Sequence, residues 1–226
     1  EDTALMVVIM NVDANDAGQT VSFTATSSDQ SLVLDASLMI TGTGATRTLT
    51  LTPEADASGT ATITLVATDS GSGTNTAMSS FDITVTAVND APTVDAVAPL
   101  TVTSDGMAKT IALSGIANGP ADESAQTLMV TATSSDTAVI PSVAVSGSGA
   151  MRTLTYTPVM GTSGPVTLTV TLLDDGGTAN GGVDRVVQTF ALTVTAVNDA
   201  PTLDAIADVT VNEDAGTVTF RAVLDG

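Results

Sequence analysis

The feature that most constrains this chain is a repeat with a period of 109 residues. Residues 85–93 read Val-Thr-Ala-Val-Asn-Asp-Ala-Pro-Thr, and residues 194–202 read the same nine residues in the same order. Shorter stretches also recur. Thr24–Asp29, for example, matches Thr131–Asp136 without a change. Self-similarity at a fixed period indicates serial copies of one structural unit. We therefore expect tandem domains rather than one large domain.

The repeat predicts how the 226 residues are divided. Residues 1–88 are expected to form one repeat that lacks its first strand, and residues 93–197 to form a complete repeat. Residues 202–226 are expected to begin a third repeat. The linkers between these parts are expected at residues 89–92 and 198–201.

Within each repeat, apolar and polar residues alternate with period two, as half-buried antiparallel strands require. In residues 166–172, Val and Leu alternate with Thr, and residues 61–68 show the same alternation. Clusters of Gly, Ser, Asn and Asp interrupt these stretches about every 8–12 residues, which is typical of a β-sandwich. The sequence therefore predicts an all-β chain of tandem Greek-key β-sandwiches, arranged as an elongated rod.

The composition excludes several classes of function. The chain has 25 acidic and 5 basic residues, a net charge of −20, which repels nucleic acid and anionic membranes. It contains no Cys and no His, so disulfides, thiolate zinc sites and Ser–His catalysis are impossible. Aromatic residues make up 2%, too few for the sugar-cradling pocket of a glycosidase. We expect a protein that is not an enzyme, binds no nucleic acid and does not insert this segment into a membrane.

The acidic residues gather at predicted loops and strand ends, in groups such as Glu54-Ala55-Asp56, Asn89-Asp90 and Asp174-Asp175. Ca²⁺ prefers about six to eight oxygen ligands, and carboxylates and Asn amides supply them. Closely spaced carboxylates repel one another unless a cation lies between them. A secreted protein without disulfides also needs another stabilising cross-link. The sequence therefore predicts Ca²⁺ at the joints between successive sandwiches.

Four motifs carry a resemblance to a known family. Val88–Pro92 and Val197–Pro201 are similar to the Asn-Asp linker of cadherins, and Ala67–Gly71 resembles the Asp-bearing strand end before the last strand of that family. Val211–Asp214 resembles the glutamate of the first strand. Over almost its whole length, the chain thus resembles the cadherin-like repeats of large bacterial surface proteins. The resemblance implies cadherin- or immunoglobulin-like sandwiches, an extracellular or cell-surface location and calcium ligands at the joints.

The resemblance also implies which residues bind the ions. At the first joint these residues come from the first repeat, the linker and the second repeat: Glu1, Glu54, Asp56, Asn89, Asp90, Asp122, Asp174 and Asp175. Asp13 and Asp69 would face a preceding domain. The second joint and the third repeat would supply Asn198, Asp199, Glu213 and Asp225.

The second joint lacks two of the acidic positions. Ser104 stands where a glutamate is expected, and Val159-Met160-Gly161 stands where the family has an acid-x-acid motif. We therefore expect the first joint to bind more calcium than the second, or to bind it more tightly.

Each acidic group also has a simpler interpretation. Asn89-Asp90 before Ala-Pro suits an ordinary turn, because Asx side chains cap turns and Pro ends strands. Asp174-Asp175 followed by two Gly residues suits a hairpin tip, and Asp122 lies in an irregular loop. Glu54 and Asp56 suit a solvated loop. The residues alone leave both interpretations open.

The function expected from these observations is structural. The chain is predicted to be a non-enzymatic adhesion or extender segment of a secreted bacterial surface protein, made rigid by calcium. One alternative is a section of a self-associating extracellular filament or sheath, formed through exposed edge strands. A second alternative is an adhesive module that binds a glycan or a protein. The expected partners are adjacent repeats of the same chain, and beyond these either like chains in a fibre or a surface ligand.

Overall fold

The computed structural model describes residues 4–9, 18–73, 75–198, 200–203, 205, 207–214 and 216–219. In this part of the chain it has thirteen β-strands, three short 3-10 helices and no α-helix. No helix in the described residues is long and apolar enough to cross a membrane. The prediction of an all-β chain built from sandwiches is confirmed.

The first sandwich consists of two three-stranded antiparallel sheets. One sheet has the order β1 (Leu5–Ile9), β4 (Arg47–Leu51) and β3 (Met39–Thr41). The other has the order β2 (Val21–Ser27), β5 (Gly59–Asp69) and β6 (Thr76–Val85). The helix η1 (Asp35–Ser37) precedes β3. These sheets form because β-branched and apolar residues alternate with polar ones, which gives each strand one buried face.

The second sandwich repeats this arrangement and adds a strand. Its first sheet has the order β10 (Val143–Ser146), β11 (Arg152–Tyr156) and β8 (Lys109–Leu113). Its second sheet has the order β7 (Leu100–Thr103), β13 (Arg185–Thr195), β12 (Gly164–Asp174) and β9 (Leu128–Ser134). The helices η2 (Ala121–Glu123) and η3 (Ala179–Gly181) lie in its loops. The added strand β7 pairs with β13 in parallel, whereas the other neighbouring strands are antiparallel.

Each sandwich has its own hydrophobic core. The first core contains Leu32, Val33, Leu49, Leu51, Ala61, Ile63, Leu65 and Ile83. The second contains Ile111, Leu113, Ile116, Val139, Ile140, Leu154, Tyr156, Val166, Leu168, Val170, Leu172, Phe190, Leu192 and Val194. The two cores share no residue, so each sandwich buries its apolar faces independently. The repeat boundaries at residues 88, 93, 197 and 202 stay predictions.

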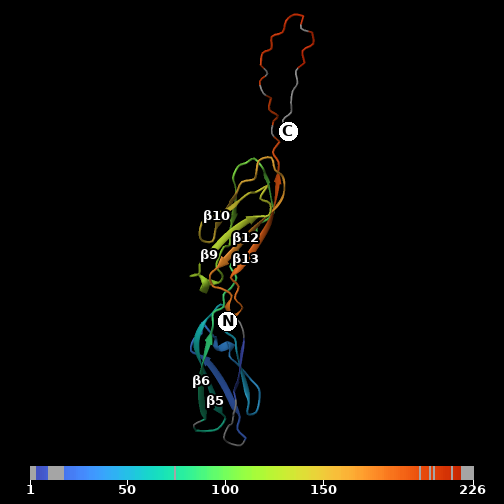
Figure 1. Ribbon diagram of the computed structural model, residues 1–226. Coiled ribbons are helices and arrows are strands. Elements are labelled where there is room, and N and C mark those ends of the chain that lie inside the picture. The colour runs from blue at the N-terminus through green and yellow to red at the C-terminus, as the bar shows by residue number, and fades with distance from the viewer. Residues whose placement is uncertain are drawn as a thin grey trace.

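The two sandwiches lie end to end along one long axis (Figure 1). The chain passes from the end of β6, in the first sandwich, through residues 86–92 into the second. It continues beyond β13 at the far end of the second sandwich. The linker at residues 89–92 therefore lies where the two sandwiches meet.

Candidate functional site

The side chain of Asn89 attaches the linker to the second sandwich. Its amide Nδ2 donates hydrogen bonds to Oδ1 of Asp174 at 3.0 Å and to the carbonyl of Val183 at 2.8 Å. Its Oδ1 accepts a hydrogen bond from Nε2 of Gln126 at 2.7 Å. The backbone N–H of Val183 also donates to the Asn89 carbonyl at 2.8 Å. Both the nitrogen and the oxygen of the Asn89 side-chain amide thus form hydrogen bonds, and these bonds fix the direction in which the chain enters the second sandwich.

The next residue, Asp90, contacts the loop that contains η2. Its backbone N–H donates to Oε1 of Glu123 at 2.6 Å. The side chain of Asn118 holds the same loop together, because its Nδ2 donates to the carbonyls of Gln126 at 2.6 Å and Glu123 at 3.2 Å. The η2 loop therefore folds back onto the linker, and it buries the Glu123 carboxylate against the joint.

Two carboxylates are buried at this joint, since Glu123 is 5% exposed and Asp174 is 6% exposed. Burial raises the pKa of Glu123 above its ordinary value, and the negative charges of Asp90, Asp122 and Asp174 raise it further. The hydrogen bond from the Asp90 N–H opposes this increase in the pKa. A buried carboxylate among like charges is an unfavourable arrangement unless a positive charge accompanies it.

Three oxygen atoms of this group are buried and, in the described part of the chain, have no hydrogen-bond partner. They are Oε2 of Glu123, Oδ2 of Asp174 and Oε1 of Gln126. Each belongs to a side chain whose other polar atom contacts Asn89 or Asp90. Buried polar atoms in folded proteins are nearly always satisfied. A hard cation such as Ca²⁺ binds to oxygen atoms, and these three have no hydrogen-bond donor opposite them.

A cavity of 190 Å³ borders the linker and is lined by Ala87, Val88, Asn89, Asp122, Glu123, Gln126 and Gly176. A water molecule takes up about 30 Å³ in the liquid, so this space can hold an ion with several water molecules. The cavity also gives the exposed Asp122 carboxylate access to the same region as the buried Glu123.

Two glycines allow the close approach of these groups. A Cβ atom at Gly176 would collide with Oδ1 of Asn89, and a Cβ atom at Gly119 would collide with Oε2 of Glu123. The N–H of Gly176 also donates to Oδ1 of Asp174 at 3.1 Å, which forms the turn at the hairpin tip. Asp174 therefore forms the predicted turn and contacts the linker at the same time.

The structure brings four of the predicted site residues together: Asn89, Asp90, Asp122 and Asp174. Asp175 is exposed and contacts another group, because its two carboxylate oxygens accept hydrogen bonds from the N–H and hydroxyl of Thr127 at 2.8 and 2.7 Å. The hydrogen bond from the Thr127 hydroxyl lowers the pKa of Asp175, and that from the Thr127 N–H lowers it further.

The remaining predicted residues lie apart from this group or outside the described chain. Glu54 is half-buried and Asp56 is exposed with a φ angle of 57°, and neither side chain forms a hydrogen bond with the joint in the described residues. Asp69 accepts a hydrogen bond from the N–H of Gly71 at 2.7 Å. Asn198 and Glu213 are exposed. Glu1, Asp13, Asp199 and Asp225 lie outside the described residues.

Ser104, which stands where a glutamate ligand is expected, is a buried residue that contacts the end of β13. Ser104 is fully buried, and its N–H and hydroxyl both contact the carbonyl of Thr195, at 2.9 and 3.3 Å.

Among the residues whose positions are described, no group of three or more acidic side chains has a geometry that could hold a metal ion. The oxygens at the first joint that the predicted ligand set lacks are those of Glu123, the neighbour of the predicted Asp122, and of Gln126.

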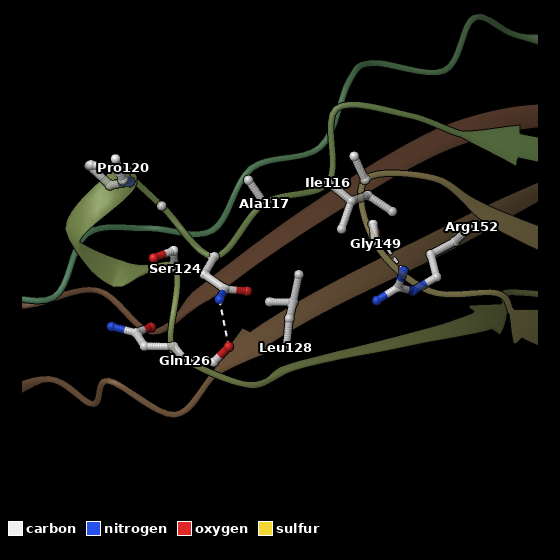
Figure 2. A pocket seen from close by; sticks show the side chains of 12 residues that line it. Ile116, Ala117, Pro120, Ser124, Gln126, Leu128, Gly149 and Arg152 are labelled. Atoms are coloured by element: carbon white, nitrogen blue, oxygen red, sulfur yellow. Dashed lines mark hydrogen bonds between the residues drawn. The ribbon is translucent and has the colours of Figure 1, made fainter.

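A larger cavity, of 470 Å³, lies beside η2 and is shown in Figure 2. Gln126 and Arg152 lie at opposite ends of this cavity, with Ile116 and Leu128 between them. Nη1 of Arg152 donates to the carbonyl of Gly149 at 2.5 Å. Arg152 is the one ionisable side chain of the lining, so the cavity contains no acid–base pair.

Comparisons with known proteins give matches among solved structures only. No family model matches it, and no curated protein matches it. Among solved structures, human mucin-like protocadherin EC1-2 is 15% identical with a TM-score of 0.41, and the match covers 85% of this chain and 99% of that one. The human desmocollin-1 ectodomain is 10% identical with a TM-score of 0.42, and the match covers 79% and 36%.

An endo-fucoidan hydrolase from glycoside hydrolase family 107 is 18% identical with a TM-score of 0.33, and the match covers 87% of this chain. The chain spans 27% of the length of that enzyme. With TM-scores below 0.5, none of these likenesses bears on what this chain does.

Proposed function

We propose that this chain is a non-enzymatic structural or adhesion segment of an extracellular surface protein, in which Ca²⁺ stiffens the joint between successive sandwiches. The observation that supports this proposal is the group of buried oxygens at the joint. Oε2 of Glu123, Oδ2 of Asp174 and Oε1 of Gln126 lack hydrogen-bond partners in the described chain, and all three side chains are attached to the linker.

The residues present fit a calcium ion in their chemistry. Carboxylates and amide oxygens are the ligands that Ca²⁺ prefers, and water completes its shell where protein oxygens are few. We expect Glu123, Asp174 and Gln126 to bind the ion, with Asp90 and Asp122 adding negative charge from the linker and the η2 loop. When bound, the ion supplies the positive charge that the buried Glu123 lacks.

A calcium ion at this place would connect the linker to two loops of the second sandwich. The linker already contacts the β12–β13 hairpin through Asn89 and the η2 loop through Asp90. Bridging these contacts limits the angles that the linker can adopt. The net charge of −20 opposes compaction, so without the ion the two sandwiches are expected to move more freely but stay extended.

The proposal of a non-enzymatic role is supported by the chemistry that the sequence offers. The chain has no His and no Cys, and the 470 Å³ cavity contains one ionisable side chain. Serial repetition also suits a spacer, because its length grows with each added unit. Extracellular calcium modules bind with dissociation constants of about 10⁻⁴–10⁻³ M, which suits a protein outside the cell.

Small-angle X-ray scattering with calcium and with a chelator tests this proposal. We expect the wild-type chain to give a narrower distribution of sandwich orientations in calcium than in chelator. Glu123→Gln is expected to reduce this difference. Asp208→Asn, which removes one negative charge at an exposed position away from the joint, is expected to leave it unchanged. Identical wild-type profiles in both conditions would contradict the proposal.

A further inference from the structure

The methionines of the described chain lie on its surface and not in its cores. The chain contains eight methionines, and the seven in the described residues have exposed fractions between 56% and 72%. They are Met6, Met39, Met78, Met107, Met129, Met151 and Met160. Neither described core contains a methionine. Methionine ordinarily fills gaps in cores, so packing does not explain these side chains.

The repeat shows that such positions face solvent in both sandwiches. Met129 in β9 stands where Ser22 stands in β2, and both residues are exposed. Met78 in β6 corresponds to Val187 in β13, which is 48% exposed in the second sandwich. The same places are thus occupied by a small polar residue or by another apolar one. The fold does not require methionine there.

The thioether is the one readily oxidised group that this chain offers to solvent. The sequence has no Cys, no His and no Trp. Its single tyrosine, Tyr156, is 3% exposed in the second core. An oxidant in the surrounding solution therefore meets methionine sulfur before any other susceptible side chain.

The reaction of a thioether with a peroxide needs nothing further from the protein. A lone pair of the sulfur attacks the nearer peroxide oxygen, so that the S–O bond forms as the O–O bond breaks. The other oxygen leaves with a proton as water or, from an organic peroxide, as an alcohol. The sulfur is oxidised to the sulfoxide and the peroxide is reduced.

The exposed positions make this oxidation harmless to the fold. A sulfoxide is polar and disrupts a core in which it is buried. At an exposed position it stays in water and removes no contact from either core. The joint is also unaffected, because the side chain of Asn89 bonds to Asp174, Val183 and Gln126, none of which is a methionine.

We propose that the exposed methionines consume peroxides at the surface of this chain without loss of its fold. The substrates are hydrogen peroxide and organic hydroperoxides, and each methionine takes up an oxygen atom. Methionine sulfoxide can be reduced enzymatically, so the sites can be used again where a reductase is present. This activity requires no calcium ion, so it stands or falls separately from the ion at the joint.

Treatment with hydrogen peroxide, followed by peptide mapping, tests the exposure of the sites. We expect the seven described methionines to be oxidised at rates within a few-fold of those in the urea-unfolded chain. The Tyr156 fluorescence transition and the circular dichroism of the β-strands should be the same before and after oxidation. Methionines that react many-fold more slowly in the folded chain, or a fold that is lost on oxidation, would overturn the proposal.

A methionine placed in the core is the matched control. Leu154 is 0% exposed, and Leu154→Met conserves its volume closely enough for the second sandwich to fold. We expect the added thioether to be oxidised many-fold more slowly than Met151, and its oxidation to lower the unfolding midpoint. Equal rates at Met151 and at the added methionine would show that exposure does not select the sites.

A competition experiment tests whether the chain protects its surroundings. The variant carries four exposed substitutions in the second sandwich: Met107→Leu, Met129→Leu, Met151→Leu and Met160→Leu. We expect it to keep the wild-type midpoint, since leucine has a similar volume. With limiting hydrogen peroxide, a methionine-containing peptide should be oxidised less beside the wild type than beside the variant. Equal oxidation of the peptide in the two mixtures would overturn the proposed activity.

Discussion

Nδ2 of Asn89 lies 3.0 Å from Oδ1 of Asp174, a residue 85 positions later in the chain. This hydrogen bond joins the linker to the tip of the β12–β13 hairpin. The other carboxylate oxygen of Asp174 is buried without a hydrogen-bond partner in the described chain. One side chain therefore contacts the linker through one oxygen, and its other oxygen is the one that the proposed cation would bind.

Replacing Asn89 with alanine is expected to destabilise the second sandwich by about 1–3 kcal/mol, because it removes the hydrogen-bond partner of the Asp174 carboxylate and of the Gln126 amide, both of which are partly buried. Tyr156 is the single tyrosine of a chain without tryptophan, and it is 3% exposed in the second core. Its fluorescence during chemical denaturation reports the second sandwich. Asn198→Ala, at the corresponding but exposed position of the other linker, is the control and should leave the midpoint unchanged.

Glu123→Gln is expected to change stability in opposite directions with and without calcium. In chelator at pH 7 the variant should be more stable than the wild type, because it removes a buried negative charge that three carboxylates repel. In calcium it should be less stable, because an ion ligand is lost. Thermal unfolding of both proteins in both conditions measures this. A variant that is less stable in both conditions would show that Glu123 has only a structural role.

The same carboxylate predicts a dependence on pH in the absence of calcium. The pKa of Glu123 is raised above 4.5 in the folded chain, so the folded state favours the protonated form. Its contribution to stability is therefore complete below about pH 4.5 and is lost as the pH rises through the folded-state pKa. In chelator, the wild type should lose more stability than Glu123→Gln between pH 4.5 and 7. Parallel curves for the two proteins would contradict the raised pKa.

The separate cores predict that core substitutions act on one sandwich at a time. Leu49 and Leu154 occupy corresponding positions in β4 and β11, and both are 0% exposed. Leu154→Ala is expected to destabilise the second sandwich by about 2–5 kcal/mol and to shift the Tyr156 fluorescence transition. Leu49→Ala should lower the stability of the first sandwich by a similar amount. It should leave the Tyr156 transition in place, and a shift would show that the two sandwiches unfold together.

The strands could be predicted from the sequence because alternation reports burial directly. From Val166 to Leu172, every second residue is buried. The same alternation extends to Asp174, which is also buried, while Asp175 has the opposite orientation and is exposed. The period of the strand therefore distinguishes the buried Asp174 from the exposed Asp175, whereas the two residue types by themselves do not.

The burial of Glu123 could not be predicted in this way. Asp122 and Glu123 are adjacent acidic residues in an irregular loop, and no periodicity distinguishes them. The η2 turn decides which one faces the linker, and it does so through contacts with Asp90, 33 positions earlier. Such contacts between distant segments are a property of the folded chain. Glu54 is half-buried and Asp56 is exposed, and for both residues the role of calcium ligand stays a prediction.

The parallel pairing of β7 with β13 has a mechanical consequence. The chain reaches β7 from the linker and leaves the second sandwich through β13, and the two strands run in the same direction. Tension applied to the two ends of the sandwich therefore pulls these strands past each other in opposite senses. All hydrogen bonds between them carry the load together in shear instead of opening one after another. A repeat closed in this way is suited to resist stretching along the axis of the rod.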